Sequence, residues 1–303
     1  MHTTAYDMYL CSFIGRPKSG RSNENIAAVD AIVTETPQKS IRSISNDSGI
    51  GHESVRRILK KDLDYKPYKI PVVQMLKEED FGARLEACTV MINKLENDPE
   101  MKKHILMTDE CIFTLDNTLS PSHSRYWSPT KPRAVQQRPM QPSRLHVWCG
   151  LTAEHVFGPY YFDGSVTADT YQTMLRDHLL PDLRRKRMMR IVVFQQDGAP
   201  AHTAHTTIEL LQRTFGDQII SRNCEFRWPA RSPDLTPPDF FLWGTLKLRI
   251  KARKPKTITE LKEFLQEEVA EINNNKALLA SVFDNFEKRL RLCVQSGGSH
   301  VLL

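Results

Sequence analysis

The sequence predicts an α/β domain built on a central mixed sheet, preceded by a small all-α domain. Short apolar runs typical of buried strands begin at residues 104, 145, 156 and 191, and segments with helical periodicity follow them. Three short helical segments rich in basic residues stand before this region. We divide the chain into an unassigned segment (1–14), a basic linker with a helix-turn-helix (15–72), a connecting helix (73–100) and the α/β domain (101–303).

The composition is that of an ordinary soluble globular protein, with 40% hydrophobic and 26% charged residues. No apolar run approaches the ~20 residues that span a bilayer, and residues 1–14 lack the features of a signal peptide. The six cysteines are far apart and form no CxxC pair. This pattern argues against a zinc site or a disulfide framework and favours a reducing compartment. The net charge of +6 is compatible with a polyanionic partner, and no membrane partner is expected.

Residues 15–72 have the pattern of a DNA-binding unit. The linker GRPKSGR at 15–21 is short and basic, and it suits a narrow minor groove through Arg16, Lys18 and Arg21. Helices are predicted at 24–35, from 41 and at 52–61, with a glycine turn at 47–51, an order typical of a helix-turn-helix. The outward cations of the last helix are expected to meet DNA phosphates. They are Arg56, Arg57, Lys60 and Lys61. A small bundle with a solvated charged face is the alternative.

An amphipathic helix is predicted at 77–95, where it would join the two domains. Strands are predicted at 104–115, 145–151 and 156–162, followed by a helix at 167–180, a strand at 191–195 and a helix at 205–215. Alternation of this kind gives a mixed sheet with flanking helices. A buried central strand is a rigid support for a functional side chain.

Three aspartates follow elements of this domain. Asp109 comes after the apolar run ILMT, and Asp197 comes after VVFQQ. Asp239 follows two prolines that suit the first turn of a helix, and the residues three, four, seven and eleven positions later are all apolar. Mg²⁺ prefers oxygen ligands, and two such ions can activate a water or hydroxyl and stabilise the leaving oxygen of a phosphodiester. The three acids therefore predict a site for two Mg²⁺ ions.

Each of these acids would, taken alone, also suit a structural role at a strand end, in a turn or at a helix cap. Asp234 competes with Asp239 as the third ligand, and Glu110 competes with Asp109, although neighbours on a strand point to opposite faces. His202 is a candidate for substrate contact or for an ordinary hydrogen-bonded turn. Six cations at 247–256 follow the third acid. They would either bind the DNA backbone or form a solvated helix end. Lys247 and Arg249 are the candidates among them for substrate contact.

Several stretches resemble transposases of the mariner superfamily. DGAPAHTA at 197–204 is similar to the second-acid motif of that family. WPARSPDLTPPDFFLW at 228–243 is similar to the third-acid motif, in which the acid matching Asp239 is the ligand. TDE at 108–110, with RYW at 125–127 and a proline at 132, resembles the first-acid region. The 41 residues between Asp197 and Asp239 exceed the spacing of mariner proper, which indicates a sister branch.

The resemblance implies a ribonuclease-H-like catalytic domain in which Asp109, Asp197 and Asp239 hold Mg²⁺ or Mn²⁺. It also implies cut-and-paste transposition by a homodimer, with double-stranded DNA as partner at both the terminal inverted repeats and the target. A nuclear location and no small-molecule cofactor are expected. The linker and helices at 15–61 match the second half of the bipartite DNA-binding region of this family.

Family members usually carry a first helix-turn-helix before the GRP linker, whereas 14 residues without a pattern precede it here. This difference leaves a second function open. The chain would then be a truncated or host-adapted, transposase-derived protein that binds DNA without transposing it.

Overall fold

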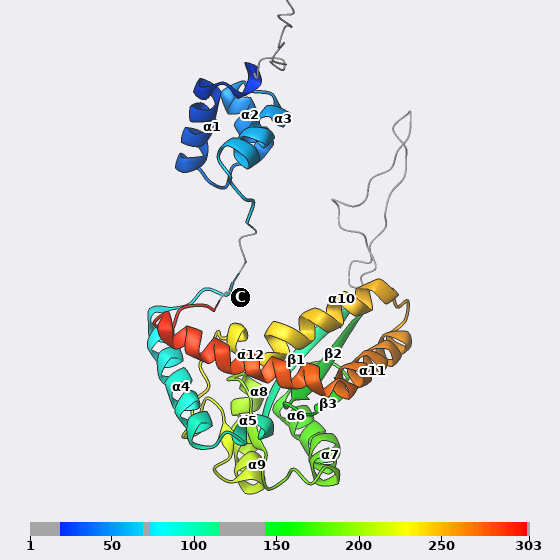
Figure 1. Ribbon diagram of the computed structural model, residues 1–303. Helices are drawn as coiled ribbons and strands as arrows, with labels where there is room; N and C mark the ends of the chain where they lie inside the picture. Colours follow the sequence, from blue (N-terminus) through cyan, green and yellow to red (C-terminus); the bar gives the residue numbers. More distant parts are fainter. Residues whose placement is uncertain (1–18, 69–72, 116–142, 302–303) are drawn as a thin grey trace, which may run out of the picture. The chain divides into compact units, whose positions relative to one another are not determined.

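The computed structural model describes residues 19–68, 73–115 and 143–301, and the chain divides into two compact units at 1–71 and 72–303 (Figure 1). The linker cations Arg16 and Lys18 lie outside the described residues, as do residues 125–127 and 132 of the first-acid resemblance. Among the described helices, none combines the length and the apolar character that are needed to cross a membrane.

The first unit is a small helical bundle. Its helical segments are η1 (Ser19–Arg21), α1 (Asn23–Glu35), α2 (Ile41–Ser48), α3 (His52–Arg57) and η2 (Ile58–Asp62). Helices α2 and α3 meet at a turn where Gly49 adopts a positive φ of 68°, a conformation that costs glycine little. The core consists of the buried side chains of Val29, Ile44, Ile50, Val55 and Ile58. The three helices and the glycine turn lie where the periodicity predicts them.

The second unit is built on a five-stranded mixed sheet. Its strands are β1 (Ile105–Thr114), β2 (Arg144–Leu151), β3 (Val156–Phe162), β4 (Val193–Gln195) and β5 (Ile219–Ile220). Their order across the sheet is β3-β2-β1-β4-β5. The pairs β1–β2 and β2–β3 are antiparallel, whereas β4 lies parallel to both β1 and β5. Strand β1 is therefore central, and β4 is its direct neighbour, as the placement of the first two acids on adjacent strands requires.

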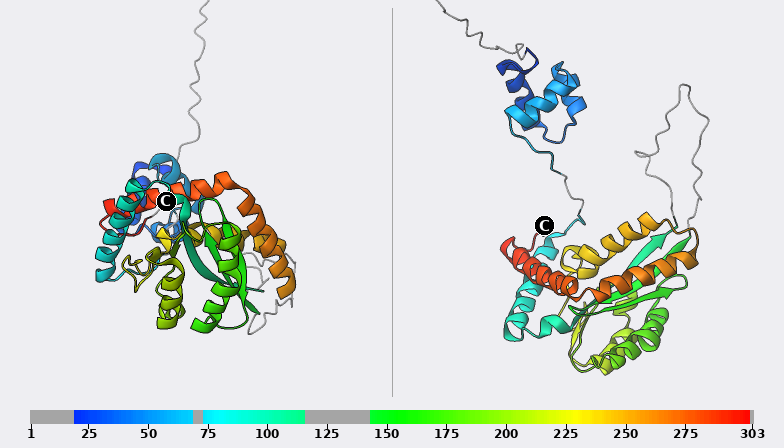
Figure 2. Two further views of the ribbon diagram at one scale, coloured as in Figure 1. Left: turned by 90° about the horizontal axis from the view of Figure 1, so that it is seen from below. Right: turned by 45° about the vertical axis from the view of Figure 1, so that its right-hand side comes forward.

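Helices cover both faces of this sheet (Figure 2). They are α4 (Glu78–Asn97), α5 (Met101–His104), α6 (Ala168–Met174), η3 (Leu175–Leu179), α7 (Leu180–Arg185), α8 (Pro200–Thr203), α9 (His205–Phe215), η4 (Pro233–Leu235), η5 (Pro238–Trp243), α10 (Gly244–Arg253), α11 (Ile258–Asn274) and α12 (Lys276–Gln295). The helix expected to join the two domains, α4, packs against α12 in the second unit.

Alternation along β1 gives each face its own core. Met107 packs in one core with side chains of α4, α10, α11 and α12, whereas Leu106 packs in the other with side chains of α6, α7 and α9. The yellow, orange and red helices accordingly lie on one side of the green strands, and the green helices lie on the other (Figures 1 and 2). The predicted mixed sheet with flanking helices is thus confirmed, and the two-residue strand β5 is an addition to the prediction.

Candidate active site

Asp109 is held at the middle of the central strand. In the register of β1 and β2 it lies opposite Cys149, where the neighbouring strand fixes its backbone. Its carboxylate Oδ2 accepts a hydrogen bond of 2.7 Å from the indole Nε1 of Trp243. Trp243 ends the η5 segment and is only 5% exposed, so this bond ties β1 to the element that carries Asp239.

Asp197 lies two residues beyond the end of β4. The turn is closed by the backbone N–H of Ala199, which donates to Asp197 Oδ1 at 2.9 Å. The chain then enters α8, whose first residue is Pro200, a residue that suits the start of a helix. Because β1 and β4 run parallel as neighbours, this turn brings Asp197 to the edge where β1 carries Asp109.

His202 is a buried bridge between two carboxylates. Its Nδ1 lies 2.6 Å from Asp197 Oδ1, and its Nε2 lies 3.0 Å from Glu110 Oε1. Burial alone would lower the His202 pKa, but the two carboxylates outweigh it and raise the pKa to about 10. The ring is therefore a doubly donating imidazolium at neutral pH. Partial burial of Asp197 would raise its pKa, yet the hydrogen bond and charge of His202 hold it below the usual value. At 2% exposure the ring has no free edge for a substrate.

Asp239 and Asp234 occupy different environments. Asp239 lies in the first turn of η5, a π-helical segment whose Leu242 and Trp243 are buried, and it faces the same cavity as Asp109. Asp234 instead pairs with the fully buried Arg84, at 2.9 and 2.7 Å to its two oxygens. Asp234 is therefore an internal ion-pair partner, and Asp239 is the acid that joins the other two at the site.

The carboxylates at the site repel one another. Burial, followed by the charges of Asp239 and Glu110, raises the pKa of Asp109 well above its usual value. Burial and the charge of Asp197 raise the pKa of Asp239 to about 6. Clusters of carboxylates with raised pKa values are common at functional sites, because like charges held close together do not stabilise the fold. Lys247 lies near enough to Asp239 to oppose part of this shift.

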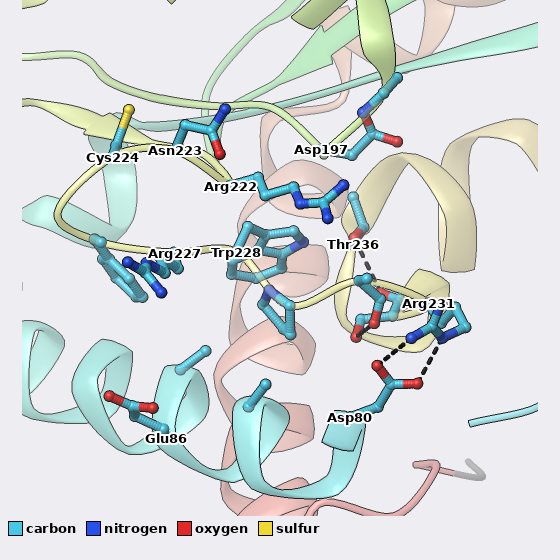
Figure 3. Close-up of a pocket in the computed structure, with 18 of the residues that line it drawn as sticks. Asp80, Glu86, Asp197, Arg222, Asn223, Cys224, Arg227, Trp228, Arg231 and Thr236 are labelled. Atoms are coloured by element: carbon cyan, nitrogen blue, oxygen red, sulfur yellow. Dashed lines mark hydrogen bonds and ion pairs between the residues drawn. The ribbon is translucent and has the colours of Figure 1, made fainter. Parts of the chain in front are cut away.

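The three aspartates line one cavity of about 1610 Å³. Figure 3 shows this cavity with Asp197 labelled. Its walls include α4 and the loop of residues 221–233, so it extends well beyond the acids themselves. Among the described residues, no three His, Cys, Asp or Glu side chains converge closely enough to hold a metal ion as they stand. Two of the carboxylates are turned toward other partners, Asp109 toward Trp243 and Asp197 toward His202.

The donor set nevertheless fits a hard divalent cation. Asp109, Asp197 and Asp239 offer carboxylate oxygens, the ligands that Mg²⁺ prefers. A dication would also relieve the repulsion that raises the pKa values of Asp109 and Asp239. These three residues could hold one or more such ions after small side-chain rotations, while Trp243 and His202 limit how far two of the carboxylates can turn.

The other predicted contact residues are engaged in ion pairs or stay untested. Arg249 pairs with Glu268 and Glu271 of α11, at 2.9 and 3.0 Å, and does not line the cavity. In the first unit, Arg56 and Arg57 both bind Glu53, and Arg21 binds Asp62 through two hydrogen bonds. The pairs to Glu53 are exposed and therefore weak, which leaves Arg56 and Arg57 able to exchange partners. The DNA-contact roles of these side chains, and of Lys60 and Lys61, stay predictions.

Sequence reasoning missed two supports of the site. The bond from Trp243 to Asp109 joins residues far apart in the chain, and the double contact of His202 depends on Glu110 as well as on Asp197. Asp197 and His202 are close in the sequence, and this short separation could have indicated the bond between them. For Trp243 the only signal was an indole on the helical face behind Asp239.

Comparison with known proteins gives a consistent result. No family model matches the chain. The Tc3 transposase of Caenorhabditis elegans is 26% identical over 208 residues, which are 65% of this chain and 57% of that protein. The Mariner Mos1 transposase of Drosophila mauritiana is 20% identical over 252 residues, which are 80% of this chain and 69% of that protein. The chain thus spans little more than half the length of the Tc3 protein.

Solved structures extend the likeness to the fold. The pre-cleavage Mos1 transpososome matches with a TM-score of 0.72 at 18% identity, over 95% of this chain and 82% of that chain. Mos1 paired-end complexes with Mn and with Mg match with TM-scores of 0.70 and 0.69. The Mos1 catalytic domain is covered over its whole length, with a TM-score of 0.58. The expected ribonuclease-H-like fold is therefore confirmed. In sequence the chain is similar to the Tc3 and Mos1 transposases, and in fold it is similar to the Mos1 structures.

Proposed function

We propose that this protein is a DNA transposase that cleaves strands at the ends of a mobile element and joins them to a target. The observation that carries the proposal is the convergence of Asp109, Asp197 and Asp239 on one cavity. They come from the central strand, from the end of its parallel neighbour and from η5, so their meeting is a property of the whole α/β fold. The similarity to the Tc3 and Mos1 transposases supports this reaction class.

The three aspartates would hold Mg²⁺ or Mn²⁺, two ions in our proposal. When bound, these ions would supply a Lewis acid for the phosphodiester and an activated water or hydroxyl. The surrounding residues of this chain orient the ligands. Trp243 fixes one oxygen of Asp109, and His202 fixes one oxygen of Asp197 while its charge keeps that acid ionised. Their bonds leave the second oxygen of each carboxylate available.

The partner in this proposal is double-stranded DNA, both at inverted-repeat ends and at the target. The first unit supports it, because the α3–η2 segment follows a glycine turn of helix-turn-helix type and carries the basic residues Lys60 and Lys61 in its last turn. Matched Mos1 structures include paired-end and strand-transfer complexes, which support action as a homodimer. A nuclear location completes the proposal, since that is where the chromosomal substrate lies.

The test is nicking of a supercoiled plasmid by the full chain in the presence of Mn²⁺. Alanine at Asp109, Asp197 or Asp239 should each abolish nicking, as should chelation of the metal. Asp163→Ala is the matched control, because Asp163 is an exposed acid in the turn after β3. Nicking that persists in all three variants would exclude the proposed site. A wild-type chain that binds DNA but never nicks it would favour the DNA-binding protein without transposition.

A further inference from the structure

The cavity at the acids continues as a groove between α4 and the loop of residues 221–233 (Figure 3). On the loop side its lining includes Arg222, Asn223 and Arg227. On the helix side it includes the small side chains of Ala83 and Ala87, which leave the groove open. Acidic side chains of α4 and of the loop, such as Glu86 and Glu225, line the groove as well, so an extended polyanion in it would depend on the cations for binding.

Arg222 is fixed next to the second acid by close packing. A Cβ atom built on Gly198 would lie 2.9 Å from Cδ and 3.4 Å from Cβ of Arg222, so the absence of a side chain at residue 198 lets the arginine pack directly against this turn. Figure 3 shows the Arg222 side chain extending from the loop toward Asp197. The aliphatic part is therefore held against the backbone that presents Asp197, while the residue remains exposed.

Among the residues that the structure describes, the charge of Arg222 has no acidic partner. Arg231, in the same loop, binds both oxygens of the buried Asp80 and therefore has a structural role. Within residues 19–68, 73–115 and 143–301, no ion pair involves Arg222, although it shares its cavity with several acids. A guanidinium held in place without an acidic partner is ready to bind an anion from outside.

The reaction proposed for this cavity supplies such an anion. A DNA strand that presents one phosphodiester to Asp109, Asp197 and Asp239 carries further phosphates on each side. These phosphates meet a site that is itself rich in carboxylates, so a cation is needed to offset the repulsion. Arginine binds a phosphate through two parallel N–H donors and therefore fixes its orientation as well as its charge.

On the basis of the proposed function, we propose that Arg222 is a substrate-binding residue whose guanidinium holds a DNA phosphate beside the phosphodiester that is cleaved. Gly198 favours this placement because it lets the arginine cross directly over the turn that carries Asp197. The loop of residues 221–233 thus acts as one wall of the path of the cleaved strand.

The test combines two measurements on the full chain. Plasmid nicking with Mn²⁺ over a range of plasmid concentrations gives kcat and KM, and the anisotropy of a short fluorescein-labelled duplex gives DNA affinity as a function of salt. The variants are Arg222→Gln and Arg222→Lys. The control is Arg213→Gln, because Arg213 is an exposed arginine on α9 that does not line the cavity.

Arg222→Gln should lower kcat/KM by about 10- to 100-fold, in line with the loss of a charged hydrogen bond. The slope of log affinity against log salt should fall in magnitude by about 1, because one phosphate contact is lost. Arg222→Lys should recover part of both, and the control should match the wild type. A purely structural role would lower the melting temperature and leave the salt slope unchanged, whereas we expect an unchanged melting temperature and an unchanged half-saturating Mn²⁺ concentration.

Wild-type values of kcat/KM and salt slope in Arg222→Gln would overturn the inference, and so would a change confined to its melting temperature. If the wild-type chain does not nick at all, the proposed function fails on its own, and the change in salt slope still decides whether Arg222 contacts DNA.

Discussion

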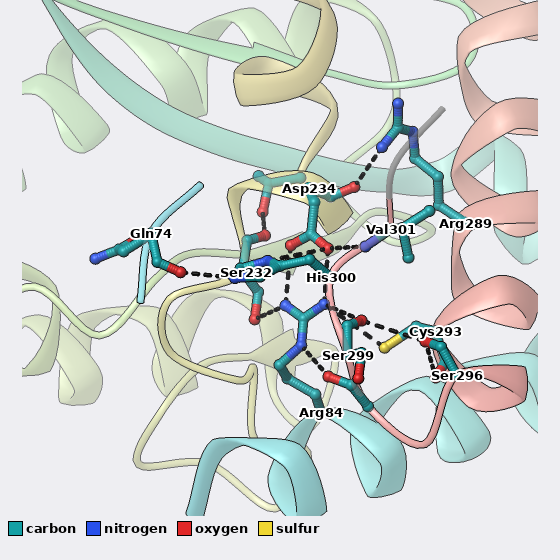
Figure 4. Close-up of polar contacts among 12 residues, drawn as sticks. Gln74, Arg84, Ser232, Asp234, Arg289, Cys293, Ser296, Ser299, His300 and Val301 are labelled. Atoms are coloured by element: carbon teal, nitrogen blue, oxygen red, sulfur yellow. Dashed lines mark hydrogen bonds and ion pairs between the residues drawn. The ribbon is translucent and has the colours of Figure 1, made fainter. Parts of the chain in front are cut away.

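Asp234 and Asp239 stand close together in the sequence but should respond to alanine in opposite ways. Asp234 is the acid that neutralises Arg84, a guanidinium with 0% exposure in the second unit (Figure 4). The same guanidinium donates to Ser232 Oγ at 2.7 Å and to the carbonyl of Gly298 at 2.7 Å. Asp234 also accepts from the backbone N–H of Val301 at 2.8 Å, so it joins three distant segments.

The size of the effect follows from burial. Removing one partner of a buried ion pair leaves an uncompensated charge and typically costs about 3–5 kcal/mol. For a unit of this size, each kcal/mol lowers the melting temperature by about 2–4 °C, so Asp234→Ala should lower it by roughly 6–20 °C. Asp239→Ala removes a carboxylate whose charged form is already disfavoured by burial and by the charge of Asp197, so the melting temperature should stay the same or rise slightly.

Scanning calorimetry of the full chain, followed through the transition of the second unit, measures the first effect, and plasmid nicking measures the second. The double variant Arg84→Met, Asp234→Ala should be more stable than the sum of the two single changes predicts, because no buried charge remains. The reasoning is refuted if Asp234→Ala shifts the melting temperature by less than about 2 °C. It is also refuted if Asp239→Ala still nicks DNA while a folded Asp234→Ala does not.

Three further outcomes are expected. Trp243→Phe removes the donor to Asp109 and should slow plasmid nicking about tenfold with little change in melting temperature. Gly150→Ala places a Cβ 2.8 Å from Leu106 Cδ1 and should cost about 1–3 kcal/mol in urea denaturation with nicking retained. Burial would raise the Asp234 pKa, but its ion pair lowers it below the usual value, so its stabilisation is full above about pH 4 and is lost as pH falls further. In calorimetry, the difference between wild type and Asp234→Asn should therefore shrink below pH 4.

Much of the fold could be predicted because its signals are local. The apolar run before Asp109 and the alternation along β1 fix a strand that is buried on both faces. The strand β5 has only two residues, Ile219 and Ile220, which are too few to show the alternation of apolar and polar residues that predicts a strand. The π-helical form of η5 also escaped prediction, since its apolar spacing fits an ordinary helix equally well.

The local sequence pattern did not separate Asp234 from Asp239, and only the family resemblance favoured Asp239. Both acids follow a proline in the same motif, and the helix-start preference of the local sequence is the same for each. The distinction depends on Arg84, which lies 150 residues away in the chain and becomes a neighbour only when α4 packs against α12. A buried arginine inside an amphipathic helix looks like a solvated one until the partner helix is known.

The geometry of the central strand explains how the adjacent acids Asp109 and Glu110 can both support the site without binding the same partner. Successive side chains of β1 point to opposite faces, so Asp109 turns toward Trp243 in the layer of α10. Glu110 turns toward His202 in the layer of α6 and α9. Since His202 also holds Asp197, Glu110 acts on the second acid through the imidazolium. His202→Gln should therefore slow nicking by freeing the Asp197 carboxylate, and Glu110→Gln should do the same to a smaller extent, although neither residue reaches the groove. Equal rates in both variants and the wild type would contradict this coupling.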